Sequence, residues 1–341
     1  MEKILQKIEE LLKNANFEIF SFNFDSTRQN YCYDFIVKKN DLVFIVKAFS
    51  NIDNIDIDML KGIKILSKIL KSKPLLIGIK NRYQKLEDNT IYLREDLPFI
   101  TIDTLENILK YQLFPFILAR RGGGVVFLDG EIMKEVREEQ KISRKELSER
   151  IGVTKRTICS YESENMRPSM EVAEKLEAVL GTDAFLRNIN VLDWRFKFNF
   201  NEEGVEKDQE LNPFEEHIQN VIRDIGIRSY FYKKGRFPFE MLISSKDLEL
   251  ECDNNFYPLF SEISYIKEHL RKINLSYLRI FAKLFHKHSL WIIKDDIKIP
   301  QLLKKEQIPV IKIKKLEKID DENEFIEFIQ GSEKPASSNQ S

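Results

Sequence analysis

The sequence is poor in cysteine and histidine. Its three cysteines, Cys32, Cys159 and Cys252, lie far apart and form no C-x-x-C pair, and the 341 residues include only four histidines. A disulfide framework and a zinc ribbon both need cysteines at short, repeated spacings, so neither is expected. We predict no metal site and no other cofactor.

Long apolar runs are also missing. A helix that spans a bilayer needs about 18 to 20 consecutive apolar residues. The N-terminus, MEKILQKIEELLKNANFEIF, has the pattern of an amphipathic helix with mixed charge rather than that of a signal peptide. We therefore expect a cytoplasmic protein that makes no contact with a membrane, and the length of the chain predicts two or three domains.

No excess of charge of one sign is present. Lysine and arginine number 54 against 55 acidic residues, which gives a formal net charge of −1. A polycationic chain is thereby excluded, and binding to nucleic acid would have to come from a local basic patch.

Several short helices are predicted between residues 129 and 181. Ser143 and Glu146 are spaced as a capping box, in which the serine starts a helix and the glutamate reaches back to its amide. Gly152 is expected to end that helix, and the next is predicted from Thr154 to Glu162. Two short helices joined by a glycine turn have the spacing of a helix-turn-helix.

Beginning at Ser143, the stretch SRKELSERIGVTKRTICSYESENMRPSMEVAEKLEAVLG resembles the Cro/C1-type helix-turn-helix domain of repressors. It shares the capped KELSERIGV helix, a polar start to the next helix, an aromatic residue followed by Glu, and RPS before a last amphipathic helix. Glu164 stands where this family often has glycine, and we expect Asn165 to take the left-handed turn instead. The domain is predicted over residues 128–185.

The resemblance implies binding to double-stranded DNA, with the helix from Thr154 to Glu162 in the major groove. Lys155 and Arg156 are expected to read bases, because both can donate to guanine O6 and N7. Arg144 is expected to contact phosphate or to brace this helix, and Arg167 to contact the DNA backbone. The predicted DNA-binding residues are Arg144, Thr154, Lys155, Arg156, Thr157, Ser160 and Arg167.

Three segments are predicted to lie outside the globular parts. Residues 200–213 are polar and acidic and are expected to form a linker, and residues 331–341 are expected to form a disordered tail. The glycine-rich ARRGGGVVFLDG is not followed by Lys-Ser/Thr, so a flexible hinge is favoured over a phosphate-binding loop.

The two outer parts, an N-terminal lobe (residues 1–120) and a C-terminal lobe (residues 214–330), resemble each other. A shift of 206 residues places YDFIVKKNDLVFIVK on FEMLISSKDLELECD and pairs Asp34 with Glu240. Each is expected to be two strands around a tight polar turn. Duplication is favoured, and chance similarity between apolar strands is the alternative.

Each lobe is predicted to contain a helix, strands, a second helix, a strand and a final strand and helix. This order resembles the restriction-endonuclease-like fold. The expected fold class is therefore multidomain, with a central all-α Cro/C1-type helix-turn-helix bundle flanked by two duplicated α/β lobes.

Hydrolysis in that fold needs at least two carboxylates and a lysine, arranged as PD...(D/E)xK. In the N-terminal lobe, Asp34 and Lys47 fit this pattern, but Ile45 occupies the place of the second acid. In the C-terminal lobe, Glu240 and Glu251 could supply two ligands, but Asp253 replaces the lysine. We predict no catalytic residues, and we expect Asp34 and Lys47 to be edge residues or a structural ion pair.

This layout resembles a family of archaeal HTH-type transcriptional regulators. The expected function is sequence-specific regulation of transcription by a homodimer on a palindromic operator. The alternative is a metal-dependent nuclease, or another DNA-processing enzyme, that the helix-turn-helix directs to its target. An adaptor that binds another protein is a third hypothesis.

Overall fold

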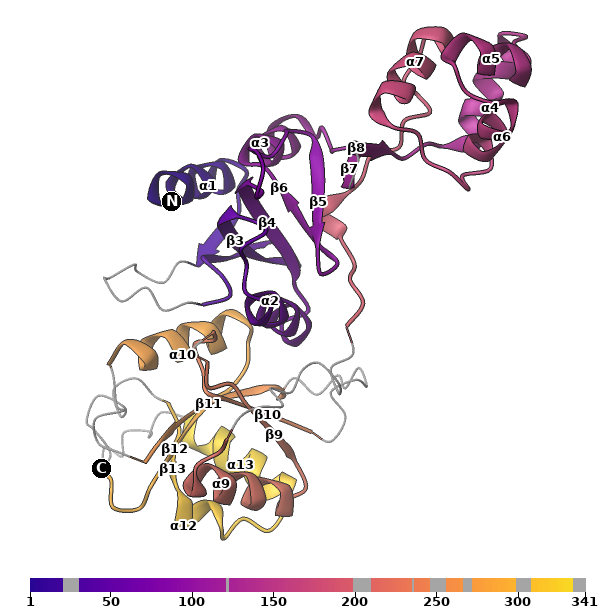
Figure 1. The fold of residues 1–341 in the computed structure, drawn as a ribbon. Helices are drawn as coiled ribbons and strands as arrows, with labels where there is room; N and C mark the ends of the chain where they lie inside the picture. The colour runs from indigo at the N-terminus through magenta and orange to yellow at the C-terminus, as the bar shows by residue number, and fades with distance from the viewer. Residues whose placement is uncertain are drawn as a thin grey trace. The chain divides into compact units, whose positions relative to one another are not determined.

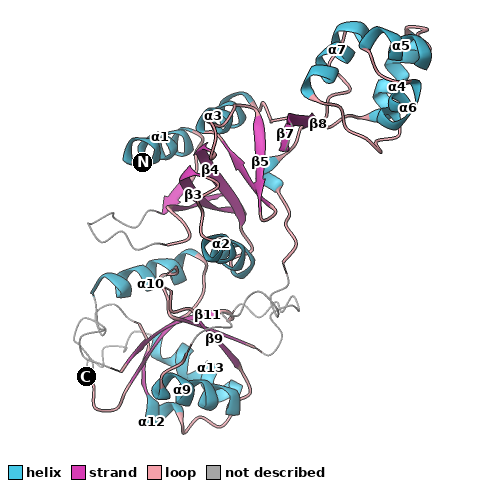
Figure 2. Ribbon diagram, in the orientation of Figure 1, coloured by secondary structure: helices cyan, strands magenta, loops and turns pink. Residues whose placement is uncertain are grey.

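The structure is a computed structural model. Figure 1 shows the course of the chain, and Figure 2 shows its helices and strands. No helix in the described part of the chain is both long and apolar enough to cross a membrane. The residues described are 1–20, 31–120, 123–198, 210–234, 236–245, 256–265, 272–298 and 308–333.

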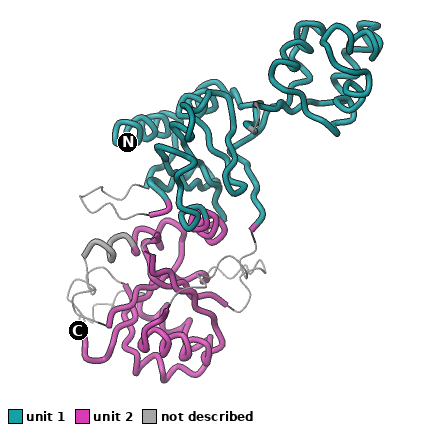
Figure 3. The backbone as a smooth tube through the Cα atoms, viewed as in Figure 1, with its two compact units in different colours: residues 1–21, 33–60, 71–197 teal, residues 22–32, 61–70, 198–341 magenta. Residues whose placement is uncertain are grey.

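The chain divides into two compact units (Figure 3). Helix α2 (Ile57–Ile69) contributes to both, because the division falls between Leu60 and Lys61. Unit 1 comprises Met1–Ser21, Tyr33–Leu60 and Lys71–Lys197, and unit 2 comprises Phe22–Cys32, Lys61–Leu70 and Phe198–Ser341.

An eight-stranded mixed sheet organises unit 1. Its strands follow the order β1-β2-β3-β4-β6-β5-β7-β8. Strand β4 pairs parallel with β3 and with β6, and β5 pairs parallel with β7, whereas the other neighbours are antiparallel. The strands are β1 (Glu18–Phe20), β2 (Phe35–Lys39), β3 (Leu42–Asn51), β4 (Lys73–Lys80), β5 (Thr90–Arg94), β6 (Leu97–Ile100), β7 (Ile117–Arg120) and β8 (Gly123–Val126).

The predicted hairpin YDFIVKKNDLVFIVKA is β2 and β3, with Asn40 in the left-handed conformation at the turn (φ 54°). Side chains alternate between the faces of a strand. Phe44 and Val46 accordingly join the core formed with helices α1 (Glu2–Asn14) and α3 (Ile102–Tyr111). Ile45 and Lys47 therefore project from the other face.

In the glycine-rich segment, the described residues on both sides of 121–122 form strands where a hinge was expected. Strands β7 and β8 pair antiparallel from Ile117 opposite Val126 to Arg120 opposite Gly123. A β-carbon on Gly124 would lie 2.6 Å from Cγ2 of Ile117, so the glycine is needed for close approach of the two strands. The glycines are visible in the sequence, but nothing near them indicates that another strand packs against Gly124.

A helical domain is inserted after β8. Its four helices enclose one apolar core, and its last residues return to the N-terminal lobe. On the return, the N–H of Arg187 donates to Phe127 O and the N–H of Ile189 to Pro115 O. The short 3-10 helix η1 (Val191–Asp193) then places Val191 in the same core as α1 and α3. The helices are α4 (Gly130–Glu139), α5 (Arg144–Ile151), α6 (Lys155–Glu162) and α7 (Met170–Leu180).

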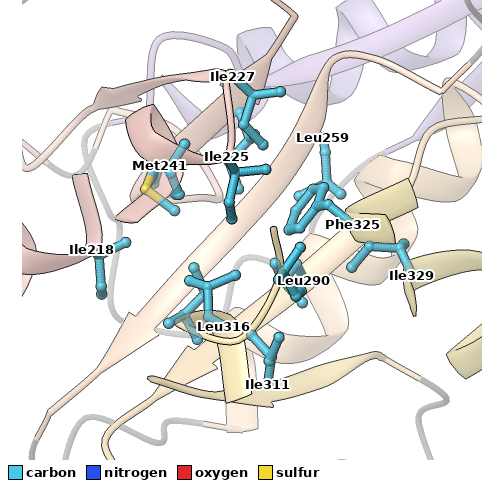
Figure 4. Packing of buried hydrophobic residues seen from close by; sticks show 14 of the residues in the cluster. Ile218, Ile225, Ile227, Met241, Leu259, Leu290, Ile311, Leu316, Phe325 and Ile329 are labelled. Atoms are coloured by element: carbon cyan, nitrogen blue, oxygen red, sulfur yellow. The ribbon is translucent and has the colours of Figure 1, made fainter. Parts of the chain in front are cut away.

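Unit 2 contains a five-stranded sheet of order β13-β12-β11-β10-β9. Figure 4 shows the apolar side chains from its strands and helices that meet in one core, among them Ile218, Met241, Leu290 and Phe325. The elements are α9 (Pro213–Asp224), β9 (Arg228–Phe231), β10 (Met241–Ser244), β11 (Leu259–Ser264), α10 (Lys272–Leu284), β12 (Ser289–Ile293), β13 (Val310–Lys312), α12 (Ile313–Leu316) and α13 (Glu322–Glu333).

The partner of β10 differs from the sequence prediction. Strand β10 pairs antiparallel with β11 and with β9, and β11 begins fifteen residues after β10 ends (259 − 244 = 15). The pairing is therefore not made through a tight turn. The strand expected at residues 247–253, including Glu251 and Asp253, lies outside the described residues.

The ends of unit 2 also refine the predicted boundaries. Asn212 caps α9 and Leu211 packs on the core, so the last residues of the predicted linker belong to the fold. Helix α13 extends to Glu333, which is within the segment expected to be a tail. Residues 199–209 and 334–341 lie outside the described part.

Candidate nucleic-acid interface

Local capping fixes the two helices of the helix-turn-helix. The hydroxyl of Ser143 accepts a hydrogen bond from the N–H of Glu146 (3.1 Å), and Gly152 ends α5 in the left-handed conformation (φ 79°). Only half of the expected capping box is formed, because the Glu146 carboxylate pairs with Arg150. At the start of α6, the Thr154 hydroxyl accepts from the N–H of Thr157 (3.1 Å), as predicted.

The first turn of α6 presents two cations to solvent. Lys155 and Arg156 are exposed, and neither forms an ion pair with any residue that the structure describes. Ile158 and Tyr161 on the opposite side of the helix are buried in the core of the domain. The helix therefore separates an apolar inner face from a basic outer face at its N-terminal turn.

Thr154, Thr157 and Ser160 have their hydroxyls engaged within α6. The Thr154 and Thr157 hydroxyls lie 2.8 Å apart, and Ser160 donates to the carbonyl of Arg156 (3.1 Å). Thr157 and Ser160 are half-buried, and Thr154 is exposed. Each hydroxyl keeps lone pairs that can accept from a base or from bound water.

Glu162 joins the end of α6 to two other helices. Its side chain is only 3% exposed, and its carboxylate accepts from Nε of Arg137 in α4 (2.6 Å) and Nε of Arg144 in α5 (2.7 Å). Arg137 also donates to the carbonyl of Ile142 (2.9 Å). Arg137 was not among the residues predicted to matter, since its pairing with Glu162 spans 25 residues. Glu162 entered the sequence analysis only as the acid that follows an aromatic residue in the helix-turn-helix resemblance.

Arg144 is held against the end of α6 by its ion pair with Glu162. Hydrogen bonding to Glu162 raises the pKa of its guanidinium above the ordinary value, so the charge is permanent. Its side chain is 37% exposed. Because the bond to Glu162 uses Nε, the terminal Nη groups stay available for an anion.

Arg167 stacks on an aromatic ring. Its guanidinium carbon lies 3.7 Å from the centre of the Phe127 ring, a cation–π contact. The residue as a whole is exposed. The stack fixes Arg167 next to the segment that enters the helical domain.

The turn after α6 differs from the expectation. Glu164, rather than Asn165, adopts the left-handed conformation (φ 55°). Arg187 holds it there, with Nη1 and Nη2 each 3.0 Å from a Glu164 carboxylate oxygen. Arg187 also pairs with Asp129, the N-cap of α4, so an ion-pair network offsets the backbone strain at Glu164.

The nuclease-like positions of the N-terminal lobe hold a structural ion pair. Nζ of Lys47 lies 2.8 Å from Oδ1 of Asp34, and the N–H of Ala48 donates to Oδ2 (2.8 Å). Ile45 is fully buried. Both Asp34 oxygens are thus engaged by protein donors, and no group of three His, Cys, Asp or Glu residues in the described chain could hold a metal ion.

Comparison with known proteins agrees with both parts of unit 1. Residues 1–113 match the family described as a PD-(D/E)XK superfamily domain, and residues 133–185 match the helix-turn-helix family. A protein of Methanocaldococcus jannaschii, named "Putative HTH-type transcriptional regulatory protein", is 32% identical over 300 residues, which cover 88% of each chain. The chain belongs to this family of archaeal HTH-type transcriptional regulatory proteins.

Other members extend the likeness along the chain. The HTH-type regulatory protein of Methanococcus vannielii is 30% identical over 342 residues and 98% of each chain. That of Methanobrevibacter smithii is 36% identical over 184 residues, which cover 54% of this chain and 57% of the relative. No solved structure matches the chain.

Membership of the HTH-type regulatory family confirms the predicted resemblance to it and the Cro/C1-type helix-turn-helix. The nuclease-like fold is confirmed for the N-terminal lobe, where the match covers the hairpin of Asp34 and Lys47. The match does not extend to the C-terminal lobe.

Proposed function

We propose that the protein is a sequence-specific regulator of transcription that binds double-stranded DNA with α6 in the major groove. The observation that carries this proposal is the exposed pair Lys155 and Arg156 on the first turn of a helix fixed at both ends. Thr154 caps one end and the buried Glu162 anchors the other. A recognition helix needs this combination of exposed donors and a rigid backbone.

The other predicted contacts fit backbone binding. Arg144 offers its Nη groups beside α6, and Arg167 is held on Phe127. Contacts to phosphate set register and orientation, and base contacts supply specificity. We therefore assign Lys155 and Arg156 to base edges, and Arg144 and Arg167 to the DNA backbone. Nearby hydroxyl groups are assigned hydrogen bonds to the DNA, those of Thr154, Thr157 and Ser160.

Alanine substitution at Arg156 tests this proposal. On an operator obtained by mapping bound DNA, loss of one bidentate base contact should weaken binding about 10- to 100-fold in a gel-shift assay at fixed salt. Lys175→Ala on α7 is the matched control, because Lys175 is exposed and pairs with Glu171 on its own helix. Equal affinity and specificity for the Arg156→Ala and unsubstituted proteins would reject the assignment of α6.

The active species is proposed to be a homodimer on a palindromic operator. Helix-turn-helix proteins of this class read two half-sites about 34 Å apart, and a two-fold symmetric protein requires a symmetric site. Light scattering on the DNA complex gives the stoichiometry, and footprinting gives the half-site spacing. One chain per operator, or a single protected half-site, would contradict the dimer.

We further propose that the protein does not cut DNA. Lys47 forms an ion pair with Asp34 and binds one of its two carboxylate oxygens. Ile45 is buried, and its side chain cannot ligate a cation. Supercoiled DNA incubated with the protein and Mg²⁺ or Mn²⁺ should remain uncut. Nicking that depends on the metal and disappears in Asp34→Ala or Glu251→Ala would favour the DNA-processing alternative.

We also propose that the two outer lobes arose by duplication. The N–H of Asp34 donates to Val46 O (2.7 Å) beside the pair Phe35 and Val46, and the N–H of Glu240 donates to Ser261 O (3.1 Å) beside Met241 and Ser261. In both hairpins, the residue just before the strand donates to the carbonyl of the residue that pairs with its successor. This shared departure from regular pairing supports common descent more strongly than apolar patterning does. Superposition of experimentally determined lobes should align these pairs, and a different register would argue against duplication.

A further inference from the structure

The hairpins of the two lobes place an acidic residue at the same point and give it different partners. In the N-terminal lobe, the carboxylate of Asp34 accepts from the N–H of Ala48 and forms its ion pair with Lys47. In the C-terminal lobe, the backbone N–H of Ile263 interacts with the carboxyl group of Glu240. The residue before Ile263, in the position of Lys47, is Glu262.

Glu262 is almost completely buried, with 4% of its surface exposed. No residue in the described ranges donates a hydrogen bond to its carboxyl group, and the neighbouring group that acts on it is the Glu240 carboxyl. Glu240 is half-buried. Two carboxylates held close together repel each other, and each loses part of its hydration. One lobe therefore contains an acid and a base where the other contains two acids.

The groups around this pair do not neutralise it. From α9, Glu215 is buried and adds a second negative charge near Glu240. Lys233, which follows β9, forms its ion pair with Glu215 and also acts on Glu240. On the side of β12, Trp291 lies opposite Glu262 and donates through Nε1 to the hydroxyl of Ser264 (3.1 Å). Apart from Glu262, the described side chains whose charge acts on Glu240 are thus one acid and one cation, and that cation is already paired with the acid.

Burial, with the nearby charge of Glu215, raises the pKa of Glu240 to about 7. Burial and the proximity of Glu240 raise the pKa of Glu262 well above its ordinary value. Both directions follow from the geometry, since a carboxyl group that loses water and faces another acid retains its proton.

We propose that Glu240 and Glu262 form a proton-dependent latch, in which the C-terminal lobe is most stable when both carboxyl groups carry protons and loosens as they ionise. The unfolded chain releases these protons near pH 4.5, whereas the folded lobe keeps them. The folded state then binds more protons, so stability falls as pH rises from about 4.5 through 7. The latch acts on the hairpin of β10 and β11 at the centre of the five-stranded sheet.

Trp291 provides a local readout. The chain has two tryptophans, Trp194 in unit 1 and Trp291 in unit 2. In the full chain carrying Trp194→Phe, fluorescence should follow the unfolding of the C-terminal lobe alone. We expect the urea midpoint to fall between pH 5.5 and pH 8.0, with an unfolding equilibrium constant that rises by up to about tenfold per pH unit for each proton released.

Glu262→Gln tests the latch, because the amide has nearly the same shape and cannot ionise. In this variant the midpoint should be higher than in the parent at pH 8.0, and its fall between the two pH values should be clearly reduced. Glu240→Gln is the second variant and should have the same effect if Glu262→Gln does not fold. Glu327→Gln is the matched control, since Glu327 is exposed on α13 and should leave the pH profile unchanged.

Two results would overturn the proposal. One is a parent midpoint that is constant or rises from pH 5.5 to 8.0. The other is a pH profile in a folded Glu240→Gln or Glu262→Gln protein that coincides with that of Glu327→Gln.

Discussion

Arg137 and Glu162 form an ion pair between two almost completely buried side chains, which are 6% and 3% exposed. Their atoms Nε and Oε1 lie 2.6 Å apart. The pair joins the first helix of the helical domain to the last residue of α6. Because a buried charge without a partner is costly, this contact is expected to hold the recognition helix in place.

Glu162→Ala should destabilise the protein by roughly 2 to 3 kcal/mol, since the Arg137 guanidinium loses its buried partner and keeps the exposed Glu138 carboxylate (3.1 Å) and the Ile142 carbonyl. Chemical denaturation followed by circular dichroism measures the loss. Glu149→Ala is the control, because the Glu149 side chain is 66% exposed and its substitution should change little. Similar stabilities for the two variants would show that Glu162 does not anchor α6.

Gly130→Ala should displace the start of α4 from the end of α6. A β-carbon at Gly130 would lie 2.2 Å from the carbonyl oxygen of Glu162, and that oxygen belongs to the backbone and cannot rotate away. We expect a loss of stability together with weaker operator binding. Gly331→Ala in α13 is a suitable comparison, because no atom lies within 4 Å of the added carbon there. Wild-type binding by Gly130→Ala would contradict this packing.

Thr154→Ala should cost about 1 kcal/mol of stability, because it removes the acceptor for the N–H of Thr157. Thr154→Ser keeps the hydroxyl and should restore most of the stability. Thermal unfolding of the two variants separates the role of the hydroxyl from that of the methyl group. Equal loss in both would assign the effect to packing instead of capping.

The pair Asp34 and Lys47 should behave as a coupled structural unit. Asp34→Ala leaves Lys47, which is 15% exposed, without its partner and also removes the acceptor of the Ala48 N–H. We expect a loss of about 2 to 3 kcal/mol. The double variant Asp34→Ala, Lys47→Met should lose less than the sum of the two single variants, as measured in a double-mutant cycle. Additive losses would show that the two charges do not interact.

The helix-turn-helix could be predicted because its signals are local. Ser143, Gly152 and Thr154 act on amides within three or four residues of themselves, and each takes its expected conformation or bond. The first hairpin was also predictable, since alternation and a polar turn define it within a dozen residues. Short-range chemistry of this kind can be recognised in a single sequence.

Features that depend on distant partners were not predictable in the same way. Glu164 takes the left-handed turn because Arg187, 23 residues later, holds its carboxylate. Residues 123 and 124 form a strand because Ile117 packs over Gly124. The ungapped shift of 206 residues pairs Lys47 with Asp253. In the two sheets, the residue that stands in the place of Lys47 is Glu262, 215 residues later, so the hairpin of the C-terminal lobe is nine residues longer (215 − 206 = 9).

The helical domain enters and leaves the N-terminal lobe at one place. Leu128 and Leu186 form an antiparallel bridge at its neck, and Val191 completes the core of the lobe after the chain returns. The helical domain is therefore an insertion in a loop of the N-terminal lobe, and its two ends lie side by side. We expect that another helical domain can replace this one at the bridge and that the packing of the lobe's core is then kept. The same arrangement means that a fragment ending at residue 120 would lack Val191 and so part of its own core.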